Sequence, residues 1–111
     1  MSKDGSELGA AWWGQSIEDM DREVARLAGL CRVRVLDPGV IDRVLQNDAS
    51  VCGTSNPAAF TKLRTALMMH YHLRDKAVGA IGEAQTSALV KQVVERLRKR
   101  FGDSLGGEAS Q

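Results

Sequence analysis

The chain has 111 residues, of which 43% are hydrophobic and 26% charged, and its formal net charge is +1. These proportions are ordinary for one globular domain and argue against disorder over most of the length. The near-zero net charge excludes a strong overall attraction to nucleic acid or to an anionic membrane.

The N-terminus is polar and acidic, and no apolar segment follows it, so no signal peptide is predicted. No stretch approaches the ~20 apolar residues that span a bilayer, so a membrane partner is not expected. We expect a cytoplasmic protein in which Cys31 and Cys52 are reduced thiols. Cys31 is predicted to be a core residue, and Cys52 a half-buried thiol in a loop over 48–55.

Residues 1–15 lack hydrophobic periodicity and contain Gly5 and Gly9, which predicts a flexible lead-in. The two tryptophans of the chain, Trp12 and Trp13, fall in this segment. Two interpretations remain open: the pair anchors a partner protein, or one ring folds back over the core.

The first helix is predicted over 16–30. Ser16 resembles an N-cap with Asp19 three residues later, an acidic variant of the capping box. Apolar residues then recur at a spacing of three and four, which indicates one buried face. They are Ile17, Met20, Val24, Leu27 and Cys31.

Basic and apolar residues alternate over 32–36, which predicts an extended connector with its valines inward and its arginines outward. Asp37 then precedes Pro38, and a capping residue before proline is a typical helix start. The second helix is therefore predicted over 38–47.

Asn56 and Pro57 repeat this start signal, and the third helix is predicted over 57–79, with a break around Gly79 and Gly82. Its apolar side chains cover an arc above about 150°, against ~100° for an ordinary surface helix. We expect a central helix with neighbours on two sides. The band contains Phe60, Leu63, Leu67, Tyr71, Val78 and Ile81.

The last helix is predicted over 84–101, with Gly102 as its stop and a disordered tail over 103–111. The fold class that results is all-α, a small bundle of four helices in a single domain over 16–102.

His70 and Arg74 are the unusual polar residues, because both fall within the apolar arc of the third helix. In the structural interpretation, His70 hydrogen-bonds a carbonyl, and Arg74 either extends its guanidinium to solvent or pairs with an acidic residue of the first helix, such as Asp21 or Glu23. In the functional interpretation, the two side chains line a cleft that binds an anion or a carboxylate.

A metal site is not predicted. His70 and His72 are two residues apart and point ~200° apart on a helix, and the spacing of Cys31 and Cys52 matches no zinc pattern. No glycine-rich phosphate loop or catalytic motif is present, so no cofactor is expected.

The basic run that includes Arg96 and Arg100 could contact phosphates, or it could be the solvated end of a helix. The leading functional hypothesis is a non-enzymatic helical protein that acts by association, with itself as an oligomer or with another protein. The alternatives are a nucleic-acid-binding or regulatory module that uses this basic end, and a small ligand-binding or enzymatic bundle that uses His70 and Arg74.

Overall fold

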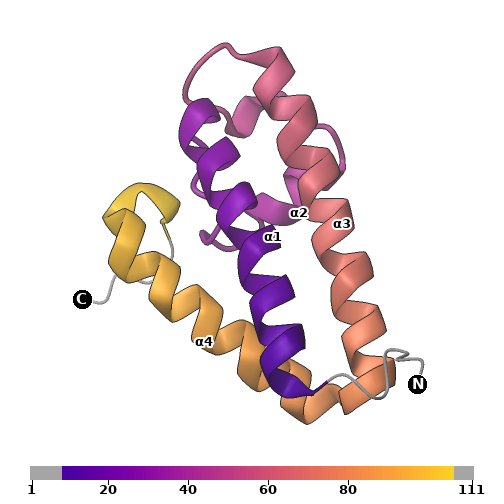
Figure 1. Ribbon diagram of the computed structural model, residues 1–111. Helices are drawn as coiled ribbons and strands as arrows, with labels where there is room; N and C mark the ends of the chain where they lie inside the picture. The colour runs from indigo at the N-terminus through magenta and orange to yellow at the C-terminus, as the bar shows by residue number, and fades with distance from the viewer. Residues whose placement is uncertain (1–8, 107–111) are drawn as a thin grey trace.

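The computed structural model describes residues 9–106 (Figure 1). Within this range the chain forms α1 (Ala10–Cys31), α2 (Val40–Leu45), η2 (Ala49–Val51), α3 (Pro57–Ile81), α4 (Glu83–Phe101) and η3 (Gly102–Leu105), where η denotes a 3₁₀ turn. The described residues contain no strand, and the predicted all-α bundle of four helices is confirmed. None of these helices is long and apolar enough to cross a bilayer.

Helices α3 and α4 form a V that is joined at Gly82, and α1 lies between the two arms and packs against both (Figure 1). Gly82 has a φ of 92°, a backbone conformation that favours glycine, and this allows the chain to reverse between the two helices. The short elements α2, η2 and η3 lie toward the open end of the V.

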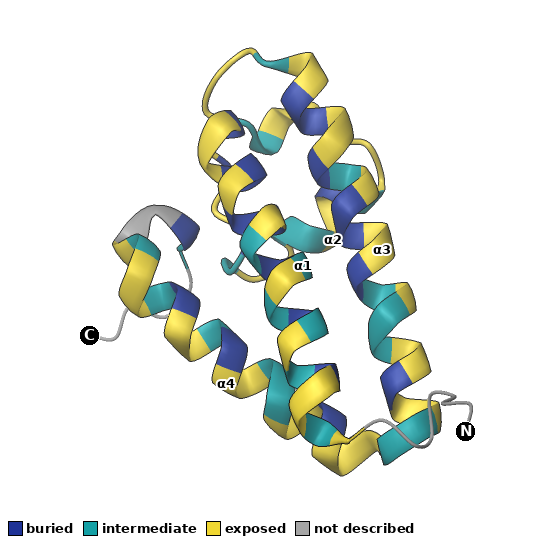
Figure 2. Ribbon diagram, viewed as in Figure 1, coloured by how far each residue is buried: buried dark blue, intermediate teal, exposed yellow. Residues whose placement is uncertain are grey.

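The core lies where α1 meets α3 and α4, and the buried positions of these helices face one another in Figure 2. Apolar side chains at helical spacing supply this burial, which is the main stabilising term for a small domain. The largest fully buried apolar side chains are Ile17, Val33, Val44, Leu63 and Val93.

The predicted start of the first helix at Ser16 is wrong, because α1 begins at Ala10 and Ser16 lies within it. The segment 10–15 is therefore helix rather than flexible lead-in, whereas residues 1–8 lie outside the described part of the chain. Trp13 is four residues before Ile17 and extends the buried face of α1. Burial of this ring favours the extra turns, and tertiary packing overrides the local cap signal.

The predicted burial pattern of the connector after α1 is correct, but its predicted extended conformation is not, because Arg32 is left-handed and the Asp37 amide donates to the Arg34 carbonyl at 3.0 Å in a turn. Val33 and Val35 are buried, and Arg32 and Arg34 are exposed. Arg32 adopts the left-handed conformation, with φ 53° and ψ 49°, which ends the helix.

Helix α2 is shorter than predicted, because it begins at Val40 rather than Pro38 and ends at Leu45. Pro38 lies in a turn that Gly39 completes with a φ of 79°. The proline therefore shapes the approach to the helix instead of occupying its first turn.

The start of α3 is as predicted: the Asn56 side chain accepts a hydrogen bond from the Ala59 amide at 3.2 Å, and Pro57 is the first helical residue. The predicted break is correct at Gly82 only. Gly79 stays within the helix, which continues to Ile81, and α4 follows from Glu83.

The predicted tail begins too early, since Gly102–Leu105 forms η3 and the Leu105 side chain is only 3% exposed. The Leu36 amide donates to the Leu105 carbonyl at 2.8 Å, which ties the end of the chain to the connector. The folded domain therefore extends to Gly106, and residues 107–111 lie outside the described range.

Substituting Leu105→Ala is expected to lower the free energy of unfolding by about 2 kcal/mol, because a buried leucine leaves a cavity when truncated. Urea denaturation monitored by circular dichroism measures this change. Leu30→Ala is the matched control, since Leu30 is exposed and should change stability by less than about 0.5 kcal/mol. Equal effects of the two substitutions would show that η3 does not stabilise the fold.

Candidate functional site

An apolar cavity of about 140 Å³ lies between α1, α3 and α4, with the connector and η3 at its edge. Its wall is mostly aliphatic, and helical periodicity turns these side chains inward. They include Val24 of α1, Leu67 of α3, Val90 and Val94 of α4, and Leu105 of η3.

Four polar side chains line the same cavity: Asp21 of α1, and His70, Tyr71 and Arg74 of α3. His70 and Arg74 are one helical turn apart, so their side chains project from the same side of α3. The structure thus brings both sequence-predicted residues to one cavity.

His70 meets Asp21 across the cavity wall, with Nδ1 and Oδ1 2.5 Å apart and both side chains less than a tenth exposed. Despite this contact, His70 Nδ1 has no hydrogen-bond partner of suitable geometry among the described residues. The prediction that His70 hydrogen-bonds a carbonyl is therefore wrong, because the group beside its ring is the Asp21 carboxylate of α1. A buried polar group with incomplete hydrogen bonding is unfavourable unless a further group completes it.

Arg74 pairs with neither of the expected acidic residues. Asp21 contacts His70, and Glu23 is bound by Arg26 at 2.6 Å, a hydrogen bond that lowers the Glu23 pKa. The Arg74 guanidinium instead lies 5.8 Å from the centroid of the Tyr71 ring, which is cation–π range. Within residues 9–106, Arg74 forms no salt bridge.

The two tryptophans have different environments, one in the core and one on the surface. Trp13 is 4% exposed and belongs to the core, whereas Trp12 is 46% exposed. Their ring centroids are 4.8 Å apart in an edge-to-face arrangement. The core ring thus supports the outer ring, and only Trp12 is available on the surface.

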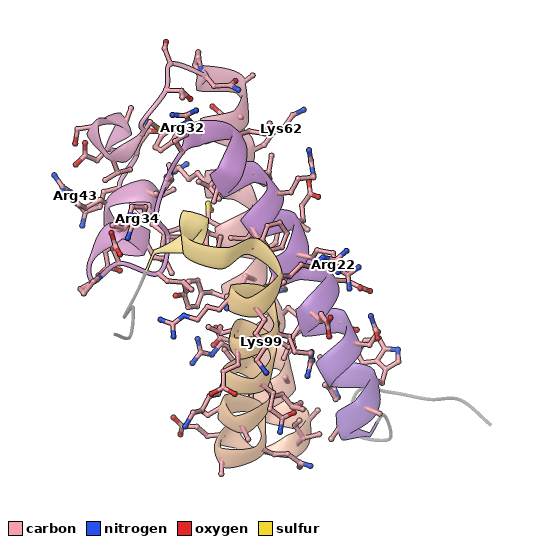
Figure 3. All side chains as sticks on the ribbon, turned by 90° about the vertical axis from the view of Figure 1, so that its left-hand side faces the viewer. Arg22, Arg32, Arg34, Arg43, Lys62 and Lys99 are labelled. Atoms are coloured by element: carbon pink, nitrogen blue, oxygen red, sulfur yellow. The ribbon has the colours of Figure 1, made fainter. Side chains whose placement is uncertain are left out.

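The basic end of α4 carries mixed charge. Arg96 donates to Glu18 at 2.7 Å, and this hydrogen bond is the main cause that lowers the Glu18 pKa. Arg100 borders a surface depression that also contains Asp19 and Glu23. Figure 3 shows the labelled basic side chains spread over several elements, so the surface gives little support to phosphate binding.

The wide apolar face of α3 is largely covered within the chain, by α1, α2 and α4. Met68 and Met69 remain about half exposed on its outer side. Val78 of the same helix is 37% exposed, so part of the apolar surface of α3 that suggested association remains accessible.

His70 is buried and His72 exposed, so the two rings diverge as their spacing predicts. Over the described residues, no three or more His, Cys, Asp or Glu side chains gather where a metal ion could bind. Sequence reasoning missed that Cys31 and Cys52 meet, because nothing local relates the end of α1 to a loop further along the chain.

Comparison with known protein families, curated proteins and solved structures gives no match to this chain. The cavity combines an aliphatic wall with two polar features. These are the buried contact between His70 and Asp21, and the Arg74 guanidinium, which forms no salt bridge among the described residues.

Proposed function

We propose that the protein binds a small carboxylate with an apolar body of roughly six carbons. The observation that carries this proposal is the apolar cavity of about 140 Å³ with Arg74 in its wall. An engineered apolar cavity of ~150 Å³ in another protein holds a benzene molecule, which sets the scale of the ligand.

The charges of the wall favour an anionic head group over a cationic one. Asp21 already contacts the His70 ring, whereas the Arg74 guanidinium lies near the Tyr71 ring and forms no salt bridge among the described residues. A guanidinium offers two parallel N–H donors that match a carboxylate. The carboxylate is therefore expected at Arg74, with the apolar body directed away from Asp21 toward Val90 and Val94.

Hexanoate, with 1-hexanol as its neutral counterpart, tests this proposal by NMR titration of the methyl resonances. We expect a hexanoate Kd on the order of 0.1–1 mM. Arg74→Gln should weaken hexanoate binding about tenfold, because a charge-assisted pair is lost, and leave hexanol binding unchanged. Lys76→Gln is the matched control, since Lys76 is an exposed cation of the same helix.

Val90→Trp is expected to fill the cavity and remove binding of both molecules. Unchanged hexanoate binding in Arg74→Gln would contradict the assigned head-group position. Shifts outside the cavity residues, or no binding of either molecule, would overturn the proposed function.

A further inference from the structure

We propose that Cys31 and Cys52 form an oxidisable dithiol that closes to an intramolecular disulfide on reaction with a peroxide. This site is separate from the cavity and does not depend on the proposed ligand. The observation behind it is that the loop containing Cys52 is hydrogen-bonded to the main chain of Cys31, which brings the two cysteines of the chain to one junction.

Main-chain hydrogen bonds hold the two cysteines together. The Gly53 amide donates to the Cys31 carbonyl at 3.0 Å, and the Thr54 amide donates to the same oxygen at 3.3 Å. These bonds join the end of α1 to the loop before α3, at the upper end of the bundle in Figure 1. Because Gly53 follows Cys52 directly, these bonds bring Cys52 next to the end of α1, and a disulfide requires such proximity of its two cysteines.

Glycine at position 53 is what permits this close approach. A β-carbon there would lie 2.8 Å from the Arg32 β-carbon and 3.1 Å from its carbonyl oxygen, closer than such atoms pack. The loop can therefore reach the end of α1 only with glycine next to Cys52.

The two thiols differ in access. Cys52 is partly exposed and lines a surface depression beside the start of α3, whereas Cys31 is fully buried behind it. In this arrangement the outer thiol meets the oxidant, and the inner thiol then attacks the oxidised sulfur to form the disulfide.

The pKa values of both thiols are raised. Burial raises the pKa of the Cys31 thiol, and the Cys52 thiolate and hydrogen bond raise it further. Burial also raises the Cys52 pKa, but the hydrogen bond from Cys31 opposes that effect. Both thiols are therefore expected to react slowly compared with a thiol of lowered pKa, and its greater exposure makes Cys52 the one that meets the oxidant.

The reaction has two steps. The Cys52 thiolate attacks one peroxide oxygen, the O–O bond breaks, and protonation of the leaving oxygen gives a Cys52 sulfenic acid and one water. Cys31 then attacks the sulfenic sulfur, the S–O bond breaks and a second water leaves. Two thiols and one hydrogen peroxide thus become one disulfide and two waters.

Intact mass spectrometry of the full chain, reduced and then treated with hydrogen peroxide, tests the proposal. A loss of about 2 Da and a linked peptide pair that contains both cysteines are expected. Cys31→Ser should accumulate a Cys52 sulfenic acid that dimedone traps, because no resolving thiol remains. Cys52→Ser should oxidise at least about tenfold more slowly, since Cys31 is buried.

Gly53→Ala should slow disulfide closure, whereas Gly79→Ala, where a β-carbon meets open space, should not. Circular dichroism establishes that each variant is folded. Oxygen adducts or intermolecular dimers without the loss of 2 Da, or equal oxidation rates in the wild type and Cys52→Ser, would overturn the proposal.

Discussion

Substituting Leu63→Ala is expected to lower the free energy of unfolding by about 3–4 kcal/mol. Leu63 is fully buried on α3, at the centre of its apolar face. Truncation removes the transfer free energy of the side chain and leaves a cavity that helices packed on several sides cannot fully close. Since small domains have only about 5–15 kcal/mol of stability, this loss is a large fraction of the total.

Equilibrium urea denaturation measures the Leu63 effect, and a thermal melt should show a fall in Tm on the order of 10–20 °C. Met68→Ala is the matched control on the same helix, because Met68 is 51% exposed. Its cost should stay within about 0.5 kcal/mol. A Leu63→Ala cost below about 1 kcal/mol would contradict the central position assigned to α3.

Substituting Asp21→Ala is expected to cost about 2–4 kcal/mol, because it leaves the His70 imidazole buried without the carboxylate that it contacts. Both side chains are nearly inaccessible, so water cannot easily replace the lost oxygen. Asp19→Ala is the control, since Asp19 is an exposed carboxylate of the same helix and should change stability by less than about 1 kcal/mol.

A double-mutant cycle separates the pair from its surroundings. His70→Leu together with Asp21→Ala removes both polar groups, so the double variant should be less destabilised than the sum of the two single variants. Urea denaturation of the four proteins gives the coupling energy. Additive single effects would show that the contact between Asp21 and His70 contributes nothing to stability.

Much of the fold follows from local pattern. Asn56 and Pro57 specify the start of α3 because capping and the proline φ act within one turn. The alternation over 32–36 correctly predicts that Val33 and Val35 are buried, although the backbone there is not extended throughout, since Arg32 is left-handed.

The misplaced boundaries have a common cause. The start of α1 at Ala10 and the burial of Leu105 both depend on packing against distant parts of the chain. The capping preference of Ser16 is worth only about 1 kcal/mol. Burial of a large apolar side chain such as Trp13 contributes more, so packing determines where the helix begins.

By itself, the sequence determined the helical class, the order of the four helices and the wide apolar arc of α3 that contains His70 and Arg74. These properties depend on residues a few positions apart, which the helical period relates directly. Only the tertiary structure decided that Asp21 faces His70, that a cavity opens beside Arg74, and that Cys31 meets Cys52. Each of these joins residues far apart in the chain, and their distance is set by how the helices pack.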